Sequence, residues 1–174
     1  MLGEATFSQL TEAEVLWQYN DESNSIAIIV NHLHGNMMSR WTNFLTSDGE
    51  KEWRERDMEF ESVIQNQKEL EYKWNEGWQC VISALETVTR ENFDTQIYIR
   101  NQGHTIVEAI NRQLAHYAYH IGQIVYIGRM IKGGDWESLS IPKGKSSTYN
   151  KEKFSKEKHR AHFTDEFLKN KNKS

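Results

Sequence analysis

Helical periodicity over three long segments is the feature that most constrains how this chain of 174 residues can fold. The first segment runs from about residue 25 to residue 45, with apolar residues three or four positions apart at Ile26, Val30, Leu33, Met37, Trp41 and Phe44. The second runs from about 62 to 88, with the same spacing at Leu70, Trp74, Trp78, Val81, Leu85 and Val88. The third runs from 105 to 131, with apolar positions at Ile106, Ile110, Leu114, Tyr117, Ile121, Ile124 and Gly128. Residues at this spacing share one face of an α-helix, so each segment is predicted to be a helix that buries one face.

Shorter elements are predicted at the N-terminus and before the third helix. Thr11 and Glu14 have the spacing of a capping box that opens a short helix, as do Thr105 and Glu108 at the start of the third long helix. Residues 96–100 alternate polar and apolar positions and precede Asn-Gln-Gly at 101–103, which predicts a short extended segment or a hairpin. Four-helix bundles need four helices of comparable length. We therefore predict an all-α four-helix bundle over residues 1–142 whose first helix is truncated.

Composition favours a single-domain soluble protein. A chain of this length can bury a core of its own without disulfides or metals. The lone Cys80 excludes a disulfide framework and a thiolate-rich zinc site, and it fits a reducing cytoplasm. The longest aliphatic run, residues 26–30, is far short of the roughly 20 residues that span a bilayer. With no basic-then-apolar leader at the start, we expect a cytoplasmic protein without a membrane segment.

Charge is distributed unevenly along the chain. Residues 143–174 carry ten Lys or Arg and four Asp or Glu, whereas residues 1–142 carry eleven and twenty-one. Because the lysines of this basic extension alternate with acidic residues, and no basic stripe lies on the periodic segments, we expect no nucleic-acid partner. We expect the extension to wrap the bundle or to be partly mobile, since its apolar residues are scattered, at Tyr149, Phe154, Phe163, Phe167 and Leu168.

Three histidines on two of the predicted helices are candidate metal ligands. His116 and His120 stand four positions apart, so their Cβ atoms lie about 5–6 Å from one another on one helix face, and both imidazoles can reach one ion at roughly 2.0–2.1 Å. His32 holds a similar position on the first long helix, and each of the three stands one residue before a residue of the apolar face. His34 faces away, about 200° round the helix. Three imidazoles leave a fourth position open, the pattern of a catalytic site; the alternative is that they are polar groups of the bundle that bond to their neighbours.

Other catalytic motifs are excluded. No glutamate lies between His116 and His120, which removes a zincin protease. Glu-x-x-His does not occur, which removes a ferritin-like di-iron site. Residues 144–146, Gly-Lys-Ser, lack the glycine that a phosphate-binding loop needs five residues earlier, where Leu139 stands. Cys80 lies in mid-helix with no adjacent histidine, which favours a packed thiol over a nucleophile.

Helical spacing also suggests which side chains surround the histidines. Asn36 is four residues after His32, Arg112 is four residues before His116, and Gln123 is three residues after His120. These three are candidate substrate-binding residues. Each has a structural alternative as well: Arg112 has Glu108 four residues away as an ion-pair partner, and Asn36 follows Gly35, where it can hydrogen-bond within a bend.

A family resemblance extends over most of the chain, and five stretches carry it. They are residues 25–33 (SIAIIVNHL), 35–37 (GNM), parts of 41–50, parts of 104–126, and 138–144 (SLSIPKG). On these stretches the chain resembles the DinB, or YfiT-like, family of four-helix bundle proteins, in a branch of unassigned function.

The resemblance implies a metal site, a partner and a class of chemistry. It implies one divalent metal, commonly nickel or zinc, held by His32, His116 and His120 with water. It also implies a homodimer, and transferases or isomerases that use a low-molecular-weight thiol such as bacillithiol. We therefore expect a metal-dependent enzyme that acts on a small molecule, a thiol-dependent transferase or a hydrolase; the alternative is a non-catalytic dimeric bundle with structural histidines. Relatives carry a longer first helix, so we expect either a start placed too late or weaker packing beside the site.

Overall fold

The computed structural model describes residues 1–162 and 164–165. Within them the chain is mostly helical, with six α-helices, two short 3-10 helices and one two-stranded sheet. The rest of the predicted basic extension, including Phe163, Phe167 and Leu168, lies outside the described residues. None of the described helices combines the length and the apolar composition that crossing a membrane requires.

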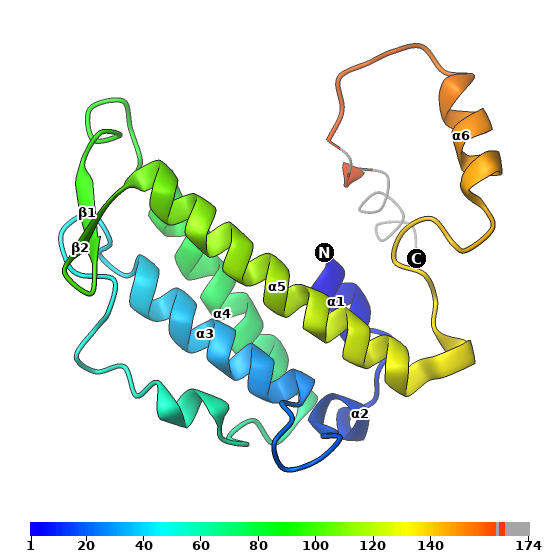
Figure 1. Ribbon diagram of the computed structural model, residues 1–174, viewed down its shortest axis with the longest axis horizontal. Helices are drawn as coiled ribbons and strands as arrows, with labels where there is room; N and C mark the ends of the chain where they lie inside the picture. Colours follow the sequence, from blue (N-terminus) through cyan, green and yellow to red (C-terminus); the bar gives the residue numbers. More distant parts are fainter. Residues whose placement is uncertain (163, 166–174) are drawn as a thin grey trace.

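Three long helices form the body of the molecule (Figure 1). They are α3 (Ile26–Trp41), α4 (Gln67–Glu86) and α5 (Ile106–Lys132), and α3 packs against both of the others. The three helices predicted from periodicity are therefore confirmed. This arrangement places α3 where its side chains can reach α4 on one side and α5 on the other.

Two predicted helix ends are wrong by several residues. The helix predicted to reach residue 45 ends at Trp41, because Thr42 adopts an extended backbone with ψ of 119° and Asn43 then has a positive φ of 50°. The helix predicted from about residue 62 begins at Gln67. There the side chain of Asn66 accepts a hydrogen bond of 2.8 Å from the backbone N–H of Glu69 and so caps the first turn.

Both predicted capping boxes and the predicted hairpin are confirmed. Thr11 and Glu14 cap the short helix α2 (Glu12–Leu16), and Thr105 with Glu108 caps α5. The hairpin pairs β1 (Gln96–Ile99) with β2 (Gln102–Thr105) in antiparallel register. It lies at one end of the three long helices, just before α5 begins (Figure 1).

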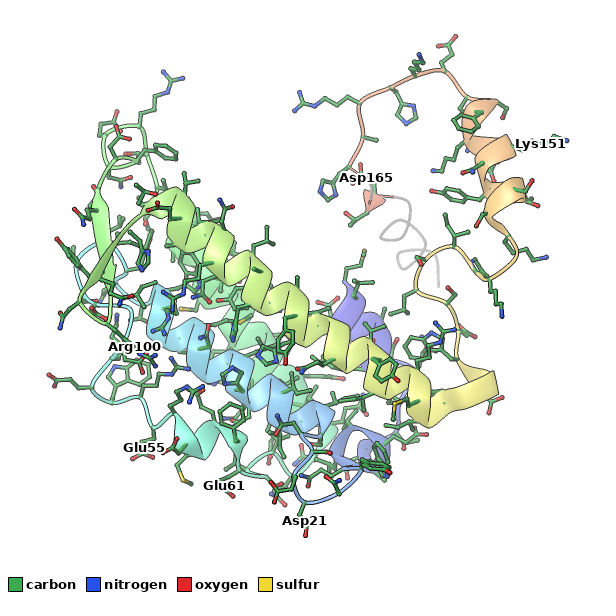
Figure 2. The ribbon with its side chains drawn as sticks, viewed as in Figure 1. Asp21, Glu55, Glu61, Arg100, Lys151 and Asp165 are labelled. Carbon is green, nitrogen blue, oxygen red and sulfur yellow. The ribbon has the colours of Figure 1, made fainter. Side chains whose placement is uncertain are left out.

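The turn of the hairpin is fixed to the segment that follows α3. Arg100 and Asn101 have positive φ values of 55° and 60°. The carboxylate of Asp48 accepts hydrogen bonds of 2.8 Å from the backbone N–H groups of both residues. Figure 2 shows the result, in which Arg100 lies at the lower end of the hairpin, toward the segment that carries Glu55.

Two short helices form the N-terminal part of the chain, where a truncated first helix was predicted. They are α1 (Leu2–Phe7) and α2, and α1 packs against α5. The contact is close, since a Cβ atom added at Gly128 would lie 2.6 Å from Cγ2 of Thr6. The body of the fold thus consists of three long helices and two short N-terminal ones.

The core confirms the predicted face of α3 and corrects that of α5. All six apolar residues predicted on the first long segment are buried, and none is more than 4 % exposed. On α5 the predicted residues Ile106, Tyr117, Ile124 and Gly128 are buried, but Leu114 is 64 % exposed. Ala109, Gln113 and His120, which were not predicted on this face, are buried as well, so His120 lies on the buried face itself and not at its border.

The basic extension contains a helix that the sequence analysis did not predict. Residues 146–154 form α6 (Ser146–Phe154), which has no buried residue. It stands apart from the three long helices, and Lys151 marks its position in Figure 2. Tyr149 and Phe154 are the only large apolar residues of this segment. Two such residues do not form an apolar face, so periodicity could not predict the helix.

Candidate metal centre

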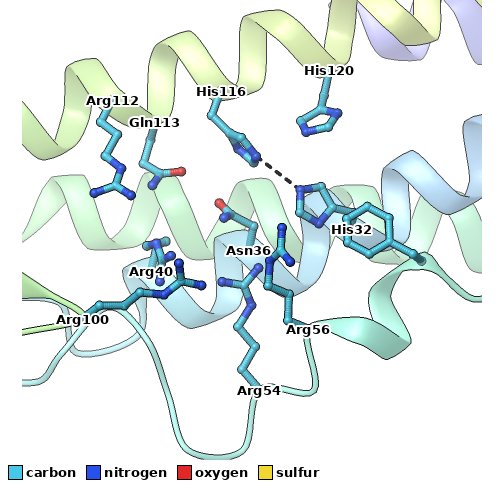
Figure 3. A pocket seen from close by; sticks show the side chains of 11 residues that line it. His32, Asn36, Arg40, Arg54, Arg56, Arg100, Arg112, Gln113, His116 and His120 are labelled. Carbon is cyan, nitrogen blue, oxygen red and sulfur yellow. Dashed lines mark hydrogen bonds between the residues drawn. The ribbon is translucent and has the colours of Figure 1, made fainter. Parts of the chain in front are cut away.

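Three histidine side chains converge between α3 and α5 (Figure 3). His32 comes from α3, and His116 and His120 stand about one turn apart on α5. Their potential ligand nitrogens all lie within 4.8 Å of one another. The Nε2 atoms of His32 and His116 are 3.2 Å apart. The structure therefore brings together the three histidines that the sequence analysis selected as ligands.

His32 is held by a carboxylate from a separate segment. Its Nδ1 lies 2.9 Å from Oε2 of Glu59, in the 3-10 helix η1 (Asp57–Phe60). Since a carboxylate only accepts hydrogen bonds, Nδ1 carries the hydrogen, and the lone pair of Nε2 is directed toward the other two histidines. The ring of Phe60 stacks on the imidazole with centroids 4.7 Å apart, which further restricts its orientation.

Glu59 is itself buried and tightly bound. The Nε and Nη2 atoms of Arg54 donate to its two oxygens at 2.7 and 2.9 Å. Burial would raise the pKa of Glu59, but the hydrogen bonds from His32 and Arg54 outweigh it and lower the pKa below its ordinary value. Gly35 makes room for this carboxylate, because a Cβ atom there would collide with Oε1 of Glu59.

The surroundings of the two histidines of α5 favour their neutral forms. Burial, followed by the nearby imidazoles of His120 and His32, lowers the pKa of His116 to about 4. Burial also lowers the pKa of His120. The Oε1 atom of Gln123 lies 2.8 Å from Nδ1 of His120, so this nitrogen donates and Nε2 keeps its lone pair. Neutral imidazoles are the form in which histidine binds metals.

A cavity of about 300 Å³ opens beside the three histidines. Its wall is made by side chains from α3, α5, the hairpin turn and the segment that leads into η1; the lining residues are His32, Asn36, Arg40, Arg54, Arg56, Phe60, Arg100, Arg112, Gln113, His116 and His120. Asn36 and Arg112 line it as predicted. Gln123 was also predicted to line the pocket, but it lies outside the wall and holds the far nitrogen of His120.

Several residues of the site were missed by the sequence analysis. Arg40 stands four residues after Asn36, and Gln113 stands three residues before His116, so helical spacing could have found both. Glu59 comes from the short 3-10 helix η1, Arg54 and Arg56 from the irregular segment before it, and Arg100 from the hairpin turn. No spacing rule relates such residues to a position on a helix.

The histidines outside the triad have other surroundings. His34 faces away from the triad, as expected, and its Nε2 lies 2.6 Å from Oε2 of Glu76 on α4. His104 lies on β2, and Arg112 donates to its Nε2 at 3.4 Å. His159 and His162 are exposed in the extension.

The triad can hold a metal ion. Neutral imidazole nitrogens suit zinc, nickel, copper and iron. Partners on the far nitrogens of His32 and His120 match the second layer of hydrogen bonds that orients metal-bound histidines. Nδ1 of His116 and Oδ1 of Asn36 are buried and lack a hydrogen-bond partner among the described residues, so the site has polar groups that its own side chains do not satisfy. An ion held by three protein ligands would keep a further position for water or substrate.

Comparison with known proteins identifies one matching family. A family model described as "Protein of unknown function (DUF1572)" matches residues 1–145. The match includes the three long helices and all three histidines, and it stops just before α6 begins. No curated protein and no solved structure matches the chain.

Proposed function

The chain belongs to the DUF1572 family, whose description assigns no activity, and we propose from the geometry of the site that it is a divalent-metal-dependent enzyme. The ion would be held by His32, His116 and His120, and the reaction would be a thiol-dependent transfer or a hydrolysis of a small molecule. The observation that carries this proposal is the convergence of three imidazoles from two helices beside a cavity.

The spacing of the imidazoles supports a shared ion. Two nitrogens bound to one tetrahedral zinc at roughly 2.0–2.1 Å stand about 3.3 Å apart. The Nε2 atoms of His32 and His116 are separated by 3.2 Å. These two nitrogens are thus already at the distance that a common ion requires.

The protein's own groups prepare this site in three ways. Glu59 and Gln123 set which nitrogen of His32 and of His120 carries hydrogen. Burial keeps His116 unprotonated at neutral pH. When bound, a divalent ion supplies Lewis acidity, which lowers the pKa of a thiol or water at the open position. The cavity then provides the space in which an electrophilic substrate can lie next to that position.

The resemblance to the DinB family supports the same proposal in finer detail. It favours nickel or zinc as the metal and a low-molecular-weight thiol, of the bacillithiol kind, as the co-substrate. It also favours a four-helix bundle in which α1 and α2 together take the place of the first helix. The cytoplasm is the proposed compartment, because the lone Cys80 leaves no disulfide framework and fits a reducing environment.

A second candidate function rests on the contact between His32 and His116. At 3.2 Å the two Nε2 atoms are also within hydrogen-bond distance, one donating and the other accepting. The triad would then be a polar network of a non-catalytic dimeric bundle protein. This alternative predicts the same stability with and without metal, and no reaction with any pair of thiol and electrophile.

Metal analysis distinguishes the two functions. Protein purified without a histidine tag should contain about one nickel or zinc ion per chain by plasma mass spectrometry, and His116→Ala should contain almost none. His34→Ala is the matched control, since His34 lies on α3 but bonds to Glu76, away from the triad. Equal and negligible metal in all three proteins would refute the metal-dependent function. If metal is present, anomalous scattering from crystals identifies it, and consumption of a thiol with an electrophile tests the reaction.

We also propose that the protein is a homodimer. Besides the resemblance, the support is an apolar groove along α4 and α5, whose lining includes the exposed side chains of Ile82, Leu114 and Tyr126. Light scattering after size exclusion should give the mass of a dimer, and Leu114→Glu should give that of a monomer. A monomeric mass for the unsubstituted protein would contradict the proposal.

A further inference from the structure

The cavity beside the triad is strongly cationic. Of its eleven lining residues five are arginines, and none is Asp or Glu. The whole chain has eight arginines and a net charge of −4. More than half of the arginines of an acidic protein are thus gathered around one small cavity. Because like charges repel, such a cluster requires negative charge either within the wall or in a ligand.

Two carboxylates behind the wall compensate part of this charge. Arg40 and Arg54 donate to Oε2 of Glu50 at 2.9 and 3.1 Å. Arg100 lies 3.3 Å from the same oxygen. The second carboxylate is that of Glu59, which binds Arg54 through both oxygens. Five arginines against two carboxylates leave three uncompensated positive charges before any ion binds to the histidines.

Arg56 and Arg112 carry most of this excess. Among the described residues neither has a carboxylate partner: Arg112 donates to His104, and Arg56 lies over the ring of Phe60 at 5.6 Å from its centroid. Figure 3 shows them reaching toward the cavity from opposite walls, Arg112 from α5 and Arg56 from the segment before η1. Their guanidinium groups are therefore available to a ligand that enters between them.

Two buried amides between the arginines and the triad also lack partners. Oδ1 of Asn36 and Oε1 of Gln113 are buried, and neither has a hydrogen-bond partner among the described residues. Both side chains line the cavity. Since an unpaired buried polar atom costs free energy, these amides indicate a polar ligand at this position. The unpaired atoms are oxygens, which only accept hydrogen bonds, so their partner would be a donor group of the ligand or a water beside it and not the oxyanion itself.

We propose that this cavity binds the oxyanion group, a carboxylate or a phosphate, of a small anionic substrate, and that Arg56 and Arg112 determine this specificity. The inference names the substrate class of the site proposed above and in that respect rests on that function. A guanidinium binds either oxyanion through two parallel N–H···O bonds. The volume of about 300 Å³ is at the lower end for small-molecule pockets, so the anion is small and its other end lies toward the triad.

Calorimetric titration of the full chain tests the inference with two probes, inorganic phosphate and malonate, at constant ionic strength. Each titration is done before and after removal of metal with a chelator. At least one probe should bind, and the stronger of the two identifies the preferred oxyanion. Arg56→Gln and Arg112→Gln should each weaken binding by about tenfold or more, because each removes a charged hydrogen-bonding group. Arg112→Lys should weaken it less, since the charge is kept.

Arg129→Gln is the matched control, because Arg129 is an exposed arginine on α5 outside the cavity. Its binding should equal that of the unsubstituted protein. Circular dichroism should show that all variants keep their helical content, since the two cavity arginines are exposed and are not part of the core.

The outcomes separate this inference from the proposed function. Absence of binding for both probes, or equal losses in Arg112→Gln and Arg129→Gln, would overturn the inference. Binding that is lost when the metal is removed, and that is unchanged in Arg56→Gln and Arg112→Gln, would also overturn the inference. That result would leave the metal-dependent function in place. Arginine-dependent binding in a chain that never contains metal would support the inference and reject that function.

Discussion

Replacing Glu59 by glutamine tests whether this carboxylate holds the site together. The two side chains have nearly the same shape, so the substitution removes charge and acceptors without leaving a cavity. Glu59 accepts three hydrogen bonds, one from His32 and two from Arg54, and its side chain is only 8 % exposed. In Glu59→Gln the amide NH₂ must face at least one of these donors, which then has no acceptor.

The magnitude follows from burial and from the remaining partners. Breaking a buried ion pair costs about 3–5 kcal/mol when the other charge is left uncompensated. Here Arg54, whose side chain is 2 % exposed, keeps Glu50 as a partner at 3.1 Å. We therefore expect the lower end of that range, a loss of about 3 kcal/mol in the free energy of unfolding. Metal affinity should fall by about 10–100-fold, because His32 loses the group that selects its tautomer.

Urea unfolding of the metal-free protein at pH 7, followed by tryptophan fluorescence, measures the stability change, and competition with a chelator measures the affinity. Glu76→Gln is the matched control: it also pairs with a histidine of α3, but its side chain is 38 % exposed. An exposed pair contributes about 1 kcal/mol or less. If Glu59→Gln destabilises the protein no more than Glu76→Gln does, the structural role assigned to Glu59 is wrong.

Three further predictions concern the same region. Gly35→Ala should destabilise the protein although alanine favours helices, because its Cβ would collide with Oε1 of Glu59. In a Glu59→Ala background the same substitution should stabilise the protein by up to about 1 kcal/mol. Thermal unfolding measures the effect of Gly35→Ala in both backgrounds, and the same sign in both would contradict the collision. The folded-state pKa of His116, about 4, lies below the value of 6.5 for an unperturbed histidine, so the unfolded chain binds the extra proton, and the stability of the metal-free protein should fall as the pH is lowered from 6.5 toward 4. In urea titrations at pH 7 and pH 5, His116→Gln should lose less free energy of unfolding between the two pH values than the unsubstituted protein. An equal loss in both proteins would contradict the lowered pKa of His116. Tyr117→Phe should cost about 1–2 kcal/mol in urea unfolding, because it leaves the buried Nε1–H of Trp41 without the acceptor that it has at 2.8 Å, and a neutral result would show that the indole finds another partner.

Local regularities in the sequence were sufficient for the helices and for the histidines. The spacing of apolar residues predicted α3, α4 and α5, and the capping pairs Thr11 with Glu14 and Thr105 with Glu108 placed two helix starts correctly. Both signals depend on residues three or four positions apart, which are neighbours on a helix whatever the rest of the chain does. The i, i+4 pair on α5 could be recognised for the same reason.

The environment of the histidines depended on the tertiary structure. Periodicity predicted that Leu114 lies on the buried face of α5. In the structure Leu114 is exposed, and Gln113 and His120 are buried beside the polar cavity next to α3. A pattern of apolar residues does not predict polar residues on a buried face, because burying a polar group costs free energy unless its surroundings are polar as well.

By itself, then, the sequence determined three amphipathic helices, two helix starts and a pair of histidines on one helix face. The tertiary structure decided that His32 meets that pair across 84 positions of sequence, and that Glu59 reaches His32 from 27 positions away. It also decided that arginines from a turn and an irregular segment surround the cavity. The physical reason is that helix formation obeys a short repeating spacing, whereas the meeting of distant segments depends on how whole helices and loops pack, which has no such spacing to reveal it.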